Sequence, residues 1–485
     1  MTEDIYCYEN GLKHINFVDD EGFSALFVVN TPIFDNSGVA HGVEHMVFRR
    51  STAFPQPETL FQLTSLTDAK INASTFANKT YFHCQSQCYH TFMLAVNYLL
   101  NGLFDPIFDT KDLRYEIHDG DNKGVIYQEL IGKEQANNEK NQSTQKSNAN
   151  QFSYGGISTS IGKLSLNDLI AFHQRYYRAS NIILVTANAN VEQIAHLIDL
   201  LPKQTELPTQ VKIEIEALKK QLQNREQNNA KNHTSKRIQK SENNDPHQKK
   251  YSSAINKLIR VYYFWLENPY CKKVERIKKR LTTNKESLLV NTQRDLIPAL
   301  INLSTKLMKD IDTNTLYLKI STEPSSLPNL FTTLCQQAKE SLTSNISNNI
   351  SHGYATDQRN ALWLTNIKAT DEVIANITSY IISASPYFLA PRCQGLCYAT
   401  QALTIEKSSY FVIYSAFNVN PNYQLKALPH CLLRLSQDDS FISMSLALAK
   451  IKYCQAYQVN NSHVMNITVS DISAYLQTLT NKNLK

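Results

Sequence analysis

The stretch from Gly38 to His45 holds two histidines and a glutamate in the order H-x-x-E-H. On a helix, His41 and His45 are four positions apart and therefore share a face. Two neutral imidazoles on one face can occupy two sites of a tetrahedral Zn²⁺ ion. Glu44 lies one position away, where its carboxylate can hold a metal-bound water and accept its proton. Two core or surface histidines on a helix would show the same spacing, so a metal centre needs further support.

The elements around this motif are typical of an α+β protein. An apolar run at 23–30 predicts a strand that leads through a loop into the motif helix. The order of strands and helices indicates one α+β domain that ends near residue 202. Its other predicted elements are strands at 71–76, 80–84 and 181–186, helices at 58–66, 92–103, 166–178 and 191–201, a polar break at 113–118 and a loop at 134–151.

A second globular part begins near Asn314 and repeats the alternation of strands and helices predicted in the first domain. It contains no second H-x-x-E-H, so the predicted chemistry belongs to the first domain. The domains are therefore predicted at 1–202 and 301–485, with a linker at 203–300. The elements predicted in the second part are strands at 315–320, 361–364 and 409–415, helices at 330–342 and 372–383, and a loop at 392–398.

The composition excludes several classes of protein. With 485 residues, of which 42% are hydrophobic, the chain is expected to fold into more than one core. It contains no apolar run of about 18 residues, so we expect no membrane span. Residues 1–6 resemble neither a secretory nor a transit signal. Nine scattered cysteines, an odd number, favour reduced thiols and a cytoplasmic protein. For the C-x₃-C pairs at 84/88 and 393/397, core packing is favoured over metal binding.

The net charge of +6 has a local origin, because lysines and arginines outnumber acidic residues strongly at 217–260. A basic stretch can bind nucleic acid, but no nucleic-acid-binding module is recognisable here. Its Asn, Gln and Lys content is typical of a solvated helical or disordered connector. We therefore expect no nucleic-acid partner, with a nucleic-acid tether as the less favoured alternative.

Several further motifs follow the H-x-x-E-H segment in a fixed order. Together they cover about residues 5–202 and resemble the pitrilysin/insulinase family of inverzincin metallopeptidases, especially its presequence-protease branch. The resemblance implies two related α/β-roll domains joined by the basic linker. The matching segments are Gly38–Met46, Phe54-Pro55 with Glu58, Asn72–Thr75 with Thr80-Tyr81, Gly124–Glu129, and Phe172–Tyr177 with Ser180-Asn181.

The resemblance implies a role for each matching residue. His41 and His45 would bind Zn²⁺, Glu44 would be the general base, and Glu129 would be the third ligand. A catalytic zinc takes three protein ligands and leaves one position for water, although Mn²⁺ or Co²⁺ suits the same donors. Residues Asn72, Ala73, Ser74 and Thr75 resemble the edge strand that pairs with the substrate backbone, an alternative being an ordinary interior strand.

A C-terminal segment, Pro391–Ala399, resembles a segment of the same branch that reaches the scissile peptide from the opposite half of the protein. Arg392 and Tyr398 keep its spacing of six positions. Arg392 would hold the substrate, and Tyr398 would donate to the developing oxyanion. The branch normally has four domains in a longer chain, so this chain is a shortened relative. It would either assemble as a homodimer or lack a closed chamber.

These observations predict a zinc metalloendopeptidase that hydrolyses short, unfolded peptides, with Glu44 as general base. The alternative is a catalytically inactive peptide-binding or assembly subunit of the same fold. Such subunits commonly lose parts of the metal motif, whereas His41, Glu44, His45 and Glu129 are all present here. The intact motif favours catalysis.

Overall fold

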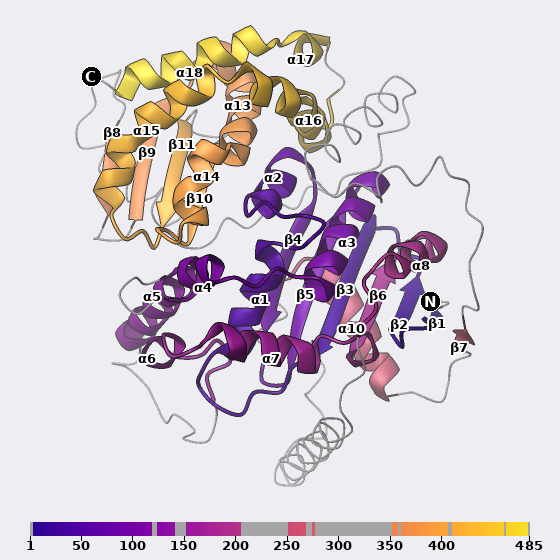
Figure 1. The fold of residues 1–485 in the computed structure, drawn as a ribbon. Coiled ribbons are helices and arrows are strands. Elements are labelled where there is room, and N and C mark those ends of the chain that lie inside the picture. The colour runs from indigo at the N-terminus through magenta and orange to yellow at the C-terminus, as the bar shows by residue number, and fades with distance from the viewer. Residues whose placement is uncertain are drawn as a thin grey trace.

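Among the described residues the strands form two sheets, each packed with its own helices (Figure 1). The computed structural model describes residues 3–118, 124–140, 152–204, 251–267, 274–276, 352–356, 360–405, 410–459 and 462–483. The strand predicted at 315–320, the helix predicted at 330–342 and most of the predicted linker lie outside these residues. The predicted α+β class is confirmed.

The N-terminal sheet has the strand order β4-β5-β3-β6-β2-β1-β7. The pairs β2/β6 and β1/β7 are parallel and the other neighbours are antiparallel. The four strands predicted in this half correspond to β3, β4, β5 and β6, and β4 lies at one end of the described sheet. The strands are β1 (Glu3–Cys7), β2 (Lys13–Phe17), β3 (Phe23–Asn30), β4 (Lys70–Thr75), β5 (Lys79–Ser86), β6 (Ile182–Ala187) and β7 (Val274–Arg276).

Helices cover both faces of this sheet. Alternate residues of β3 face opposite ways, with Phe27 in the core on one side and Val28 in the core on the other. This double burial explains why β3 is apolar throughout. The helices on the Phe27 side include α1 (Val39–Arg49), α3 (Tyr89–Phe104), α7 (Leu166–Tyr176) and α8 (Val191–Asp199), and α2 (Thr59–Leu66) extends toward the other domain.

The Val28 side is covered by α10 (Ser253–Glu267), which lies inside the predicted linker. Its buried Ile255, Leu258 and Tyr262 pack on the sheet. The last residues of the basic stretch, 253–260, lie in α10 and pack against the N-terminal sheet, so this part of the stretch is not a connector. Lys257 of this helix pairs with Asp19 and Glu21 of the same domain. The outer domain boundaries stay predictions.

Two predictions in the N-terminal half were wrong. The polar break predicted at 113–118 overlaps α4 (Thr110–Glu116), and the loop predicted at 134–151 begins inside α5 (Val125–Lys140). Asp109 caps α4 by accepting a hydrogen bond from the amide of Asp112. The fully buried residues of α4 are carboxylates, Asp112 and Glu116, so this helix has no clear apolar period to detect. A short helix, α6 (Ser158–Ile161), follows.

The C-terminal sheet is antiparallel, with the order β10-β11-β9-β8. The strands predicted at 361–364 and 409–415 and the helix predicted at 372–383 are confirmed as β9, β11 and α13. The predicted loop at 392–398 begins inside α14, so Arg392 is helical. The elements are β8 (His352–Thr356), β9 (Asn360–Asn366), α13 (Glu372–Ala384), α14 (Pro386–Cys393), β10 (Ala399–Ile405), β11 (Tyr410–Ala416), α15 (Pro421–Ser436), α16 (Asp439–Tyr457), α17 (Ser462–Asn466) and α18 (Val469–Asn483).

Helix α2 joins the two domains. It packs against α13 and α16 of the C-terminal domain. Lys452 of α16 donates to the carbonyl oxygens of Thr64 and Ser65, at 2.8 and 2.9 Å. These carbonyls belong to the last turn of α2, where the helix dipole also favours a positive charge. The contact therefore stabilises the helix end and the domain arrangement together.

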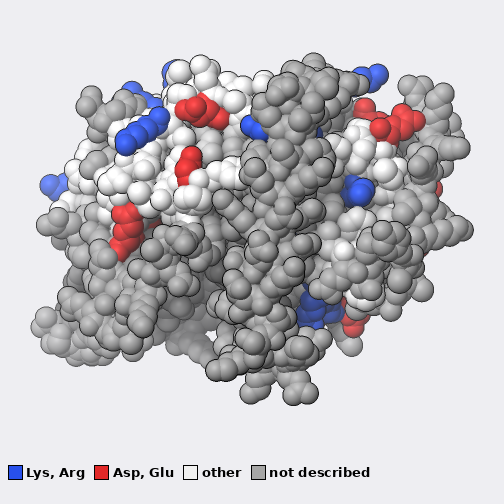
Figure 2. Space-filling model, turned by 90° about the horizontal axis from the view of Figure 1, so that it is seen from below, with Lys and Arg blue, Asp and Glu red and all other residues white. Residues whose placement is uncertain are grey.

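No single described helix has the length and apolarity to cross a membrane, although the bent pair Ala369–Ala384 and Pro386–Cys393, at 45°, meets both criteria. Most of α13 is buried in the core of its domain. On the face seen in Figure 2, basic and acidic side chains of described residues are interspersed.

Stability at acid pH offers a test of this packing. His173 of α7 is buried, lies 2.9 Å from the carbonyl oxygen of Leu103 in α3, and has a pKa lowered to about 4 by burial. Below pH 6.5, His173 is protonated in the unfolded chain but stays neutral in the folded chain. The free energy of unfolding therefore falls as the pH falls toward 4. On account of His173 the loss is about 2 kcal/mol between pH 6.5 and 5.

The variant His173→Gln keeps a donor for Leu103 but does not titrate. We expect its free energy of unfolding to fall less between pH 6.5 and 5 than that of the wild type, by this amount, in urea unfolding experiments. Equal pH dependence in the two proteins would contradict the neutral, buried state of His173.

Candidate metal centre

Helix α1 holds the two motif histidines in a rigid setting. The residue that precedes it is Gly38, whose φ of +77° suits glycine. A Cβ at Gly38 would lie 2.8 Å from the carbonyl oxygen of Gly155, so glycine also allows this loop to approach. Val43 and Val47 are buried in the core. The rings of His41 and His45 stand side by side, with centroids 4.9 Å apart and planes at 80°.

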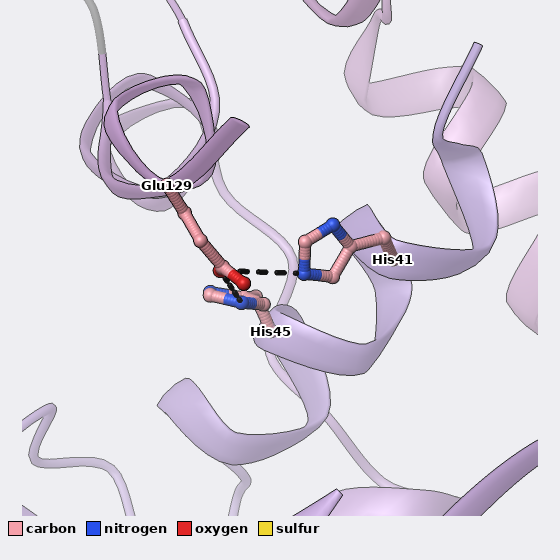
Figure 3. A group of neighbouring side chains, drawn as sticks. All are labelled: His41, His45 and Glu129. Atoms are coloured by element: carbon pink, nitrogen blue, oxygen red, sulfur yellow. Dashed lines mark ion pairs between the residues drawn. The ribbon is translucent and has the colours of Figure 1, made fainter. Parts of the chain in front are cut away.

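Glu129 of α5 completes a three-residue group with these histidines (Figure 3). Its Oε2 lies 3.6 Å from Nε2 of His41 and 3.9 Å from Nε2 of His45. Ligands about 2.0–2.1 Å from a shared tetrahedral ion would be about 3.4 Å apart, so the spacing fits zinc. The three side chains are only 8–12% exposed. The predicted ligands therefore converge in space, while their role as ligands stays a prediction.

The second nitrogen of each imidazole has its own partner. Nδ1 of His41 lies 3.1 Å from the carbonyl oxygen of Gly155, and Nδ1 of His45 lies 3.0 Å from Oε2 of Glu116. Both partners accept hydrogen bonds, so each Nδ1 carries a proton, and in the neutral form of the ring Nε2 then keeps its lone pair. This arrangement orients both rings, with Nε2 of His41 and of His45 lying 3.6 and 3.9 Å from Oε2 of Glu129.

Glu116 lies at the centre of a buried charge network. Burial alone would raise the pKa of its carboxyl, but Arg392, His45 and Arg49 hold that pKa well below its usual range. Arg49 of α1 also donates to Asp112 and to the carbonyl oxygen of Cys393. The carboxylate of Glu116 is therefore ionised and a strong acceptor for His45.

The predicted general base, Glu44, is also held in place. Its side chain is buried, and the hydroxyl of Thr75 donates to its Oε2 at 2.5 Å. Thr75 ends β4, so the base is tied to this strand. Within the described sheet β4 pairs only with β5 and lies at one end, and its role as a substrate-binding edge strand stays a prediction. The side-chain oxygen of Asn72 accepts a hydrogen bond from the amide of Ala73, and the hydroxyl of Ser74 donates to the carbonyl oxygen of Ala73.

Arg392 and Tyr398 reach this region from the C-terminal domain. The guanidinium of Arg392 binds Glu116 at 3.0 and 3.4 Å. The negative charge of Glu129, burial and the charge of Glu44 raise the pKa of Tyr398, against the opposing effect of Arg392. The hydroxyl of Tyr398 therefore keeps its proton at neutral pH and is available as a donor.

Cysteines take no part in the described metal group. Burial raises the pKa of Cys393 and of Cys397 to about 12, so both are neutral thiols. Cys84 and Cys88 are buried in the N-terminal core. Among the described residues, His41, His45 and Glu129 form the one group of three that could hold a metal ion.

Sequence reasoning missed Glu116, Arg49 and the contact between Thr75 and Glu44. Glu116 and Asp112 lie four positions apart on α4, a spacing that places both on one face of a helix. That signal was hidden because the segment was predicted as a break.

Zinc binding should separate ligands from the base. Glu129→Gln replaces a ligand, and we expect it to weaken zinc binding by more than the 10–100-fold typical of outer-shell partners. Glu44→Gln, a matched change of a neighbouring buried carboxylate, should leave zinc affinity within a few-fold of the wild type. Competition with a chromophoric chelator measures both. Equal losses in the two variants would contradict the assignment of Glu129.

Comparisons with known proteins agree with the motifs. The family model for insulinase, peptidase family M16, matches residues 34–148. A chloroplastic and mitochondrial presequence protease 1 of Arabidopsis thaliana is 27% identical over 180 residues, covering 34% of this chain and 17% of that protein. A mitochondrial presequence protease of Candida albicans is 26% identical over 204 residues, covering 36% and 18%.

Among solved structures, the inactive domain of an M16 peptidase from Pseudomonas fluorescens aligns with 99% of this chain and 95% of that chain, at 11% identity and a TM-score of 0.33. The matched segment spans about a fifth of the length of the curated relatives. The resemblance predicted from the motifs is confirmed, and residues 34–148 match the family model for insulinase, peptidase family M16.

Proposed function

We propose that this chain is a zinc metalloendopeptidase that hydrolyses short, unfolded peptides. The observation that carries the proposal is the convergence of His41, His45 and Glu129, with the buried Glu44 adjacent to His45 in helix α1. Three nitrogen and oxygen donors with one carboxylate alongside suit a hydrolytic zinc site. The predicted cytoplasmic location stays a prediction.

The residues of the chain divide the chemistry among them. Zinc bound by His41, His45 and Glu129 would polarise the peptide carbonyl and lower the pKa of water. Glu44 accepts the proton of the attacking water and returns it to the leaving amine. Thr75 orients Glu44 through its hydrogen bond. Tyr398, protonated at neutral pH, donates to the developing oxyanion.

The substrate class follows from strand β4. An edge strand binds an extended peptide through main-chain hydrogen bonds, and such pairing depends little on the sequence of the peptide. A bound strand would take over the main-chain groups of Ala73 that Asn72 and Ser74 now bind. Unfolded peptides of varied sequence are therefore the proposed substrates.

The main alternative is an inactive peptide-binding or assembly subunit of the same fold. Both functions would use β4, but only catalysis requires Glu44 to lie beside the metal ligands. The hydrogen bond from Thr75 keeps the buried Glu44 oriented, as a general base requires. This contact favours the enzyme, and loss of activity without loss of zinc distinguishes the two.

Replacement of the base gives the decisive test. In Glu44→Gln, we expect cleavage of an unstructured fluorogenic peptide of about twenty residues, a length suited to strand addition, to fall about 10²–10⁴-fold, because general acid–base catalysis is lost. Both proteins must contain equal zinc. Absence of cleavage by either would support the binding subunit, and equal rates would indicate a contaminating protease.

Thr75 provides a finer test of the same site. Thr75→Val keeps the shape of the side chain but removes the donor to Glu44. A hydrogen bond to a charged group is worth about 1.5–3 kcal/mol, so we expect kcat/KM to fall at least tenfold. Thr75→Ser keeps the hydroxyl and should stay near the wild-type value. Equal losses in both variants would show that Thr75 acts through packing.

A further inference from the structure

The C-terminal domain contacts the metal centre through Arg392, which lies in the last turn of α14. This arginine is 9% exposed and binds no carboxylate of its own domain among the described salt bridges. Its partner is Glu116 of α4, in the N-terminal domain. The ring centroid of Phe61 in α2, also in the N-terminal domain, lies 5.2 Å from the guanidinium carbon of Arg392. Arg392 is thus held by residues of the opposite domain.

Arg392 binds both oxygens of the Glu116 carboxylate. One terminal nitrogen lies 3.0 Å from Oε1 and the other lies 3.4 Å from Oε2. The same Oε2 accepts from Nδ1 of His45 at 3.0 Å. An arginine that spans both oxygens constrains the plane of a carboxylate, which one ion pair to a single oxygen does not. Arg49 also donates to Oε1, but of the two arginines only Arg392 also contacts Oε2, the oxygen that His45 binds, so Arg392 contributes to the direction of the bond to His45.

Two glycines let the domains approach closely around this contact. A Cβ at Gly395 would lie 2.3 Å from the carbonyl oxygen of Tyr115, next to Glu116. A Cβ at Gly132 would lie 2.4 Å from the ring of Phe417. The C-terminal domain thus packs tightly against both α4, which carries Glu116, and α5, which carries Glu129.

We infer that Arg392 is a positioning residue of the metal centre: it orients Glu116, Glu116 orients His45, and docking of the C-terminal domain thereby raises the affinity of the N-terminal domain for zinc. This inference rests on the proposed function, because it assumes that the site binds zinc. By linkage, bound zinc stabilises the docked arrangement of the two domains by the same factor.

A different role for Arg392, contact with the substrate, was expected from the sequence. Its Nε has no hydrogen-bond partner among the described residues, so one donor remains for a peptide. Its two terminal nitrogens, however, are committed to Glu116. The two roles differ in what they predict without a substrate, because only the positioning role changes zinc affinity.

The test is zinc affinity of the full chain, measured by competition with a chelator in the absence of peptide. We expect Arg392→Gln to bind zinc more weakly, by up to the roughly 10–100-fold that follows from losing a direct partner of a ligand, such as Glu116. Arg392→Lys keeps the charge but cannot span both oxygens, and it should also bind more weakly than the wild type. Arg434→Gln is the control, because Arg434 packs on Tyr387 within the C-terminal domain.

A double-mutant cycle with Glu116→Gln locates the effect. If Arg392 acts through Glu116, the Arg392→Gln change should cost little further affinity once Glu116 is replaced. Additive losses, or unchanged zinc affinity in both Arg392 variants with reduced cleavage, would overturn the inference and leave the proposed function intact. A wild type that binds no zinc would refute the proposed function itself.

Discussion

The ionised carboxylate of Glu116 is buried, and the surrounding structure depends on how its charge is balanced. An isolated buried carboxylate is strongly destabilising, so its position requires close partners. Arg49 of α1, Arg392 of α14 and His45 of α1 supply them. Three helices, from both domains, are therefore held at one point. Because His45 is also a metal-ligand candidate, the charge balance that stabilises the interface also orients the site.

Helix α1 connects this network to the core. Its inward residues, among them Val43, pack with α3 and α7, while its other face carries His41 and His45. Helices α1 and α3 can pack closely because residue 102 of α3 is a glycine. A Cβ at this position would lie only 2.4 Å from the carbonyl oxygen of Val47. A helix that is buried over most of its length holds its two imidazoles in a fixed relation, so the ligands are already ordered when the protein has folded.

Prediction from the sequence succeeded where a local pattern reflects burial and failed where it does not. Strand β3 was recognisable because both of its faces are apolar. Helix α4 was missed because its inward Asp112 and Glu116 are polar. Helix α10 was assigned to a linker because of its basic surroundings, although Leu258 and Tyr262 pack on the sheet. For α4 and α10, the position of the helix depends on tertiary contacts that no local sequence pattern reports.

The sequence by itself determined the pairing of His41 with His45 and the place of Glu44 beside them, because helix geometry converts spacing directly into a shared face. The choice of Glu129 came from a resemblance to a family, since nothing local distinguishes it from other carboxylates. Only the tertiary structure decided that Glu129 approaches both histidines, that Thr75 holds Glu44, and that Arg392 binds Glu116. Such contacts join elements far apart in the chain, and their distances depend on how whole helices, strands and domains pack.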